Sequence, residues 1–126
     1  MTTPKCNILI AEDHEDVRDL LKSRLEEKGC RVMEARNGLE AVELAPLHKP
    51  DLIFMDLRMP VLDGFEATRR LRQIPVMTSI PIVGLSSLCD GWHELAIAAG
   101  CDDCLLKPIS DEELTEILKR FLHLES

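Results

Sequence analysis

The chain has 126 residues, of which 45% are hydrophobic and 30% are charged, a composition typical of one globular domain with its own core. Its net charge of −8, from 15 basic and 23 acidic residues, argues against nonspecific binding to nucleic acid or to an anionic membrane. No apolar stretch approaches the roughly 20 residues of a membrane span, and the first residues carry acids where a signal peptide is apolar, so we expect a cytoplasmic protein.

Short apolar segments alternate with amphipathic segments along the chain. The apolar segments predict β-strands, and several lack the alternation of polar residues that a half-exposed sheet would have. They are Cys6 to Ala11, Cys30 to Ala35, Asp51 to Asp56, Pro81 to Leu85 and Asp103 to Leu106. Between the strands, apolar residues recur at the spacing of one helix face. The predicted helix faces comprise Val17, Leu20, Leu21 and Leu25; Leu39, Val42 and Leu44; Phe65, Ala67 and Leu71; Leu95, Ala96 and Ala99; and Leu114, Ile117, Leu118 and Phe121.

Local signals mark the helix ends. Asn37 with Glu40, and Ser110 with Glu113, have the spacing of a capping box at a helix start. Two glycines and two prolines stand where helices are expected to stop: Gly29, Gly100, Pro46 and Pro50. Strict alternation of five strands with five helices predicts an α/β fold with a doubly wound parallel sheet, in which right-handed crossovers cover both faces.

The carboxyl ends of the predicted strands carry polar side chains. They are Glu12 and Asp13 after the first strand, Asp56 at the end of the third, Ser86 after the fourth, and Lys107, held extended by Pro108, after the fifth. Doubly wound sheets bind ligands beyond the carboxyl ends of their strands. If the first and third strands are neighbours, three carboxylates share one small patch.

Three clustered carboxylates need positive charge, because two like charges about 4 Å apart repel by about 4 kcal/mol at an effective dielectric of ~20. Lys107 supplies one positive charge, and a divalent cation would supply two more. Mg²⁺ is the predicted cation, since it prefers carboxylate and water oxygens and often binds phosphate as well. We expect Asp13 and Asp56 to bind it directly and Glu12 to act through water.

A cation held among carboxylates favours phosphoryl chemistry, whose transition state requires mainly positioning and charge neutralisation. Asp56 is the expected nucleophile, because an ionised aspartate needs no general base and aspartyl phosphates are known covalent intermediates. Lys107 is expected to pair with one phosphoryl oxygen, and the Ser86 hydroxyl to donate a hydrogen bond to another.

These residues closely resemble the receiver domain of bacterial two-component response regulators. The motifs that carry the resemblance are Glu12-Asp13, Asp56-Leu-Arg-Met-Pro60, Asp63-Gly64, Ser86 and Lys107-Pro108. Their order and spacing cover nearly the whole chain, so residues 1–126 are expected to form a single receiver domain with an ordered core at about 5–123. The resemblance also implies a flavodoxin-like α/β/α fold with strand order 2-1-3-4-5.

The resemblance further implies a function. A phosphohistidine on a sensor histidine kinase or a phosphotransfer domain would donate its phosphoryl group to Asp56 in the presence of Mg²⁺. The carbonyl of Arg58 would also bind the metal, and the Lys107-Pro108 peptide bond would be cis. The phosphate would be lost slowly by self-catalysis, so the protein would be a signalling phosphoacceptor rather than a conventional enzyme.

One position departs from the family pattern. Cys104 stands where receivers usually carry an aromatic switch residue, and the chain contains no tyrosine. We therefore expect the signal to leave through the backbone around Ser86 and through a surface formed by the fourth helix, the fifth strand and the fifth helix. This surface, which includes Trp92, would contact a downstream protein, a linked output domain or a second copy of the chain. The alternative function is a degenerate receiver that docks partners without being phosphorylated.

Two other functions share parts of this pattern. A flavodoxin-like nucleotide binder needs a Gly/Ser/Thr-rich phosphate loop after the first strand, where this chain has EDHED. An aspartate-based phosphatase is expected to carry a second Asp two residues after the first, where this chain has Arg58.

The cysteines and histidines suggest no strong site of their own. Five cysteines, an odd number, are expected to be reduced thiols in apolar surroundings. The spacing of Cys101 and Cys104 leaves a redox or metal role as an alternative, although no second Cys/His pair lies nearby in the sequence. The histidines have no ligand spacing and are expected at the surface.

Overall fold

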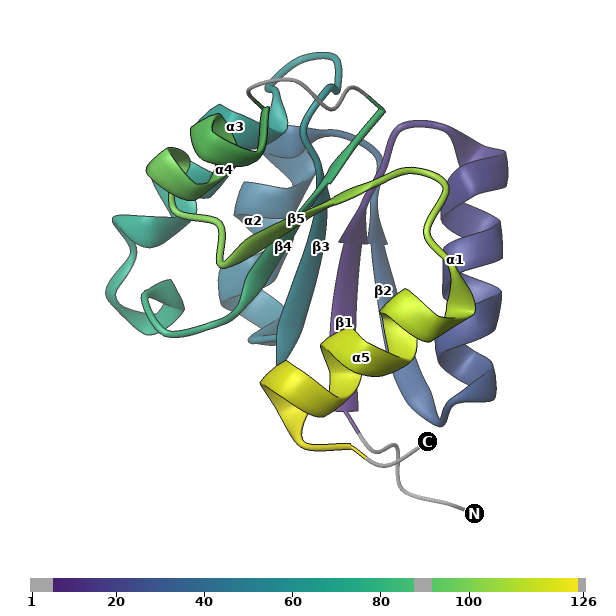
Figure 1. Cartoon of the computed structure of the whole chain (residues 1–126). Helices are drawn as coiled ribbons and strands as arrows, with labels where there is room; N and C mark the ends of the chain where they lie inside the picture. Colours follow the sequence, from purple (N-terminus) through teal and green to yellow (C-terminus); the bar gives the residue numbers. More distant parts are fainter. Residues whose placement is uncertain (1–5, 88–91, 125–126) are drawn as a thin grey trace.

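Five parallel strands form one sheet in the computed structural model, which describes residues 6–87 and 92–124 (Figure 1). The strands are β1 (Cys6–Ala11), β2 (Cys30–Ala35), β3 (Leu52–Asp56), β4 (Ile82–Ser86) and β5 (Asp103–Leu106). Their order is β2-β1-β3-β4-β5, and each neighbouring pair is parallel. The predicted fold class and strand order are therefore confirmed.

Helices cover both faces of the sheet. They are α1 (Glu15–Glu27), α2 (Gly38–His48), α3 (Gly64–Arg72), α4 (Trp92–Ala99) and α5 (Asp111–Leu122), with a short 3₁₀ turn η1 (Pro75–Met77) after α3. In Figure 1, α1 and α5 lie on one side of the sheet and α2, α3 and α4 on the other. No helix in the described residues is both long enough and apolar enough to span a membrane.

The sheet divides the core into two apolar layers. Along β1, Ile8 and Ile10 pack beneath α1 and α5, whereas Leu9 packs on the side of α2 and α3. On β3, Phe54 packs in the layer of Ile8 and Ile10, and Ile53 packs in the layer of Leu9. Burying each large apolar side chain contributes roughly 1.5–3 kcal/mol to folding. A sheet covered on both faces explains why the strand sequences lack polar alternation.

Most of the predicted helix ends are confirmed. Asn37 accepts a 2.9 Å hydrogen bond from the Glu40 backbone, and Ser110 and Glu113 form the reciprocal bonds of a capping box. Gly29 and Gly100 have φ angles of 90° and 120°, which favour glycine.

The expectation that Pro46 bounds the second helix is wrong, because Pro46 lies inside α2. It stands near the carboxyl end, where its missing N–H removes one helical hydrogen bond without stopping the helix. The helix ends at His48 and is capped by Lys49, whose left-handed backbone has a φ of 48° and whose N–H donates to the Ala45 carbonyl.

The buried face of α1 also differs from the prediction. Leu21 and Leu25 are buried, but Val17 is 39% exposed and Leu20 is 55% exposed. Arg18 is instead only 8% exposed. Its guanidinium donates a hydrogen bond to the carbonyl of Glu12, in the loop that follows β1.

Candidate functional site

Three predicted site residues meet at the carboxyl edge of the sheet. Asp56 ends β3 and is 2% exposed, and Glu12 follows β1 and is fully buried. Lys107 follows β5, and its Nζ lies 2.8 Å from Glu12 Oε1 and 3.4 Å from Asp56 Oδ1. The edge therefore brings two buried carboxylates together around one ammonium group.

Strand register produces this arrangement. Ala11 pairs with Met55, so the residues that follow, Glu12 and Asp56, stand level on adjacent strands. Asp56 in turn pairs with Leu85, which places Ser86 one residue beyond it on β4. Parallel pairing across β1, β3 and β4 thus brings Glu12 level with Asp56 and puts Ser86 one residue further along.

Ser86 and Lys107 are linked through their backbones. Ser86 is 2% exposed, and its carbonyl accepts a 2.7 Å hydrogen bond from the Lys107 N–H. The Lys107-Pro108 peptide bond is cis, as the family resemblance implies. The loop after β5 is therefore tied to the end of β4.

Asp13 provides a buried oxygen atom without a hydrogen bond. Within residues 6–87 and 92–124, Asp13 Oδ1 is a buried side-chain oxygen that accepts no hydrogen bond. Glu12, by contrast, uses both oxygens, one toward Lys107 and one to accept the His14 N–H at 3.1 Å. A buried carboxylate oxygen without a donor is costly, so the arrangement suits a cation at Asp13.

The protonation of the site follows from burial and charge. Burial raises the pKa of Asp56 to about 7, helped by the neighbouring Glu12 and opposed by Lys107. Burial also disfavours ionised Glu12, but hydrogen bonds from Lys107 and other groups outweigh it and lower the pKa of Glu12. The pKa of Lys107 is raised, because its contacts with both acids outweigh its own burial. In the absence of a cation, Asp56 thus holds a proton more readily than Glu12 does.

Two residues near the site were missed by sequence reasoning. His14 was expected at the surface and is exposed, yet its Nδ1 lies 3.4 Å from both Glu12 and Asp13. Arg18 donates a 2.8 Å hydrogen bond to the Glu12 carbonyl and a 3.1 Å bond to Glu34. The only sequence signal for His14 was its place beside Asp13. For Arg18, an arginine within a predicted helix, the sequence carried no signal of a role at the site.

Four side chains could together hold a metal ion. Ligand atoms of Glu12, Asp13, His14 and Asp56 all lie within 4.8 Å of one another. Arg58 contributes its backbone N–H, which donates to Asp56 Oδ1 at 3.2 Å. The donor set is mainly carboxylate oxygen, which suits a hard divalent cation such as Mg²⁺.

The loop after β3 packs closely against the site. The Gly64 N–H donates to the Leu57 carbonyl at 3.1 Å, and Asp63 caps α3 by accepting from Glu66 at 2.9 Å. A Cβ atom at Gly64 would collide with the Asp56 carbonyl. Glycine at this position therefore lets α3 begin against the end of β3.

Cys104 packs against the same apolar layer as Trp92. Burial, with Cys101 and Asp103 nearby, raises the pKa of the Cys104 thiol to about 11. Burial likewise raises the pKa of Cys101, whose sulfur lies 3.8 Å from the Thr68 hydroxyl. Thiols that stay protonated are weak metal ligands, which speaks against the metal alternative for this pair.

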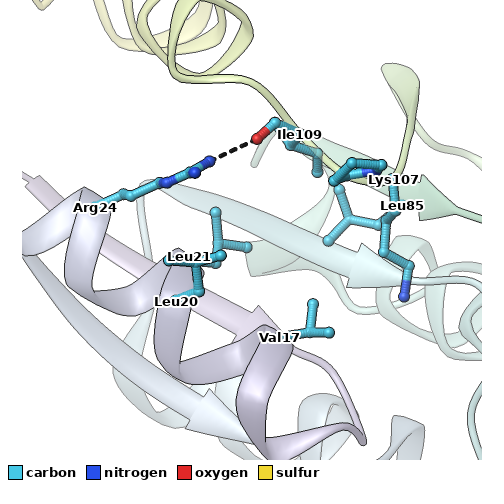
Figure 2. A pocket seen from close by; sticks show the side chains of 8 residues that line it. Val17, Leu20, Leu21, Arg24, Leu85, Lys107 and Ile109 are labelled. Atoms are coloured by element: carbon cyan, nitrogen blue, oxygen red, sulfur yellow. Dashed lines mark hydrogen bonds between the residues drawn. The ribbon is translucent and has the colours of Figure 1, made fainter.

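A groove of about 260 Å³ adjoins the site between α1 and the loop after β5 (Figure 2). Its lining residues are mostly apolar: Val17, Leu20, Leu21, Arg24, Leu85, Lys107, Pro108 and Ile109. Arg24 bridges the groove by donating a 2.7 Å hydrogen bond to the Ile109 carbonyl, as Figure 2 shows. The exposure of Val17 and Leu20 is thus explained by their place on this groove.

Comparison with known proteins adds to this geometry. A family model described as the response regulator receiver domain matches residues 8–119. The polar-differentiation response regulator DivK of Brucella anthropi is 34% identical over 117 residues, which cover 92% of this chain and 95% of DivK.

Solved structures of receiver domains also match this chain. The receiver domain of sensor histidine kinase PA1611 from Pseudomonas aeruginosa PAO1 has a magnesium ion coordinated in its active site cleft. It superposes with a TM-score of 0.88 at 35% identity, covering 94% of this chain and 98% of that domain. The co-crystal structure of the Saccharomyces cerevisiae histidine phosphotransfer protein Ypd1 with the receiver domain of its downstream response regulator Ssk1 contains a matching chain. That match has a TM-score of 0.86 at 30% identity and covers 96% of this chain and 91% of the other.

Proposed function

The chain belongs to the family of response regulator receiver domains, which are phosphoacceptors of two-component signalling, and from this premise we propose that Asp56 accepts the phosphoryl group. The observation that carries the proposal is the contact of one ammonium, Lys107, with two buried carboxylates at the ends of β1 and β3. Asp56 is the carboxylate of this pair that makes the looser contact with Lys107, which leaves it the more available as a nucleophile.

The donor is proposed to be a phosphohistidine on a histidine kinase or a phosphotransfer protein. Transfer breaks the bond between phosphorus and the donor imidazole nitrogen and forms a bond between phosphorus and an Asp56 oxygen. The departing imidazole takes up a proton. Lys107 is proposed to pair with one phosphoryl oxygen and the Ser86 hydroxyl to donate to another, which stabilises the charge that the transfer brings into the site.

Mg²⁺ is the cation that we propose for the site. Asp13 and Asp56 would bind it through their carboxylates, Arg58 through its carbonyl, and Glu12 through water. The buried Asp13 oxygen that accepts no hydrogen bond supports this assignment, as does the magnesium ion in the P. aeruginosa relative. When bound, Mg²⁺ would neutralise charge on the phosphoryl oxygens and keep Asp56 ionised despite its raised pKa.

The groove beside Lys107 is the proposed docking surface for the phosphodonor. Its apolar lining from α1 and Ile109 opens next to the ammonium that contacts Asp56, so a partner seated there could present a phosphohistidine to the site. The S. cerevisiae relative is crystallised with a histidine phosphotransfer protein, which fits a partner of this kind. Leu20 is 55% exposed and offers such a partner an apolar contact.

The output surface is proposed to be the face formed by α4, β5 and α5. Leu95 on α4 is 53% exposed and Leu106 on β5 is 48% exposed, which gives this face apolar contact area. Lys107 directly follows Leu106 and is bonded to the Ser86 carbonyl, so a change at the phosphorylated site has a short path to this face.

Intact-mass measurement tests the phosphoacceptor proposal. The protein is incubated with acetyl phosphate and Mg²⁺, and we expect the mass to increase by one phosphoryl group. Asp56→Asn should abolish the increase, whereas Asp19→Asn, a change at an exposed residue of α1, should retain it. A protein that gains no mass but still binds a histidine kinase would instead support the degenerate docking receiver, which the replacement of the switch aromatic by Cys104 favours.

A further inference from the structure

The thiols of Cys6 and Cys30 face each other at the edge of the sheet opposite the acidic site. Cys6 begins β1, Cys30 begins β2, and the two residues pair in register. The Cys6 thiol donates to Cys30 Sγ across 2.9 Å, and the residues are 6% and 5% exposed. We propose that this pair is an oxidation site that forms an intramolecular disulfide between β1 and β2.

The backbone is already placed for such a bond. Disulfides usually join residues whose Cα atoms are about 4.4–6.8 Å apart, and neighbouring strands lie about 4.8 Å apart. Closing the sulfur separation from 2.9 Å to a disulfide bond requires a movement of about 0.9 Å. Side-chain rotation with a small shift of the strand ends suffices.

The sheet also determines which cysteines can pair. Cys6 and Cys30 belong to the apolar layer beneath α1 and α5, whereas Cys101 and Cys104 belong to the opposite layer. A disulfide between the layers would have to pass through the sheet. Among the described cysteines, oxidation is therefore directed to the Cys6–Cys30 pair or to the Cys101–Cys104 pair, and a sulfur contact is present for the first. Cys89 lies outside the described residues.

A peroxide is the proposed oxidant. The thiolate of one cysteine attacks a peroxide oxygen, which gives a sulfenic acid and one water molecule. The sulfur of the second cysteine then displaces the sulfenic oxygen as a second water molecule, forming the disulfide. In total, two thiols and one hydrogen peroxide molecule give one disulfide and two water molecules. The small exposed fractions favour hydrogen peroxide over bulky disulfide oxidants.

The bond would stabilise the fold without altering the phosphorylation site. It closes a loop from Cys6 to Cys30 that contains all of α1, and cross-linking restricts the unfolded chain more than the folded one. Glu12 and Asp56 stand at the other end of their strands. We therefore expect the oxidised protein to have a higher Tm and an unchanged capacity for phosphorylation.

Peptide mapping of the folded, full-length protein tests the proposal. The protein is treated with hydrogen peroxide, the remaining thiols are alkylated, and the digest is analysed by mass spectrometry before and after dithiothreitol. We expect a peptide that joins Cys6 to Cys30 and a rise in Tm, both reversed by dithiothreitol. Cys30→Ser should abolish both, and Cys104→Ser should retain both.

Recovery of Cys6 and Cys30 as separate peptides, whatever the other thiols do, would overturn the proposal. So would a linked peptide that forms only in urea, because it would show that the folded geometry does not direct the reaction. The mapping is made on the wild-type protein and does not depend on how the variants fold. It is also independent of phosphorylation at Asp56, so this proposal and the proposed function can fail separately.

Discussion

Lys107 Nζ lies 2.8 Å from the buried Glu12 carboxylate, although β3 and β4 separate the strands that lead to these two residues. The long lysine side chain spans this distance along the carboxyl edge of the sheet. The contact to Asp56 is longer, at 3.4 Å. Lys107 therefore neutralises Glu12 first, and it must weaken this ion pair or share its donors when a phosphoryl group arrives on Asp56.

Removal of this ammonium should destabilise the fold. We expect Lys107→Met to lower the free energy of unfolding by roughly 3 kcal/mol, because breaking a buried ion pair leaves Glu12 with an uncompensated charge. Urea denaturation measures the change. Lys119→Met, at an exposed position of α5, should change the stability by no more than about 0.5 kcal/mol. If the two variants are equally stable, the Lys107–Glu12 contact contributes nothing to the fold.

A double variant tests whether the cost comes from the pair itself. Glu12→Gln removes the charge that Lys107→Met leaves unpaired, so the combined variant should be more stable than the sum of the single losses predicts. Additive losses would contradict the direct coupling.

Mg²⁺ should stabilise the folded protein, because a ligand that binds only the native state shifts the unfolding equilibrium. At a concentration about 100 times its Kd, the gain should be about 2.7 kcal/mol, seen as a rise in Tm. Asp13→Asn should remove most of this gain, since Asp13 Oδ1 is the buried oxygen that accepts no hydrogen bond. Asp16→Asn, in the exposed first turn of α1, should keep it, and an equal response of both variants would place the ion elsewhere.

The raised pKa of Asp56 predicts how stability depends on pH without metal. Burial raises this pKa from its ordinary value of 3.8 to about 7, so the folded state binds the proton more tightly than the unfolded state. The resulting stabilisation is complete below about pH 4 and is lost as the pH rises to about 7, a total of no more than about 4 kcal/mol.

Comparison with Asp56→Asn in a chelator isolates this effect. The variant has no proton to lose, so its stability relative to wild type should increase from about pH 5 to about pH 8. Chemical denaturation across this range measures the difference. A difference that stays constant with pH would show that Asp56 titrates normally in the folded protein.

The fold was predictable because each local signal agrees with the global arrangement. Apolar strands without polar alternation indicated a sheet covered on both faces, and Gly29 and Gly100 marked the helix ends. The charges of Glu12, Asp56 and Lys107 could be assigned to one edge because parallel strands bring their carboxyl ends together. Pro46 was misjudged because a proline near a helix end costs only one hydrogen bond, which packing of Ala41 and Ala45 against the core offsets.

The groove and the contacts of Arg18 could not be predicted, because they depend on side-chain directions that the spacing of residues in the sequence does not specify. Val17 and Leu20 match the apolar periodicity of α1, yet they point into an open groove that forms only when the loop after β5 packs nearby. The sequence carried no signal for Arg18, which is buried because Glu34 on β2 and the Glu12 carbonyl supply its partners. Contacts between residues distant in sequence determined both outcomes.

Arg18 should act as a positioning residue for Glu12. We expect Arg18→Met to weaken Mg²⁺ binding several-fold, because the Glu12 carbonyl loses a 2.8 Å hydrogen bond that fixes the loop after β1. It should also cost roughly 2 kcal/mol of stability, from a buried carbonyl left without its donor. Lys22→Met removes the other cation bonded to Glu34 and leaves the Glu12 carbonyl untouched, so Mg²⁺ affinity should stay unchanged. Equal Mg²⁺ affinities for the two variants would assign Arg18 a purely structural role.

Phosphorylation should change the rate at which the backbone amides of α4 exchange hydrogen with the solvent. Ser86 ends β4, and its carbonyl accepts a hydrogen bond from the N–H of Lys107, which follows β5. Strand β5 packs beside α4. A phosphoryl group that attracts both side chains should therefore shift α4. Hydrogen exchange with and without beryllofluoride, a phosphoryl mimic, should differ in α4, whereas exchange in α2 should stay constant.

The fluorescence of Trp92 should also report the shift. Its ring packs edge-to-face on the Phe65 ring, with 5.4 Å between the ring centroids. Asp56→Asn should remove both responses, and an α4 that exchanges at the same rate with the mimic bound would exclude the proposed output face.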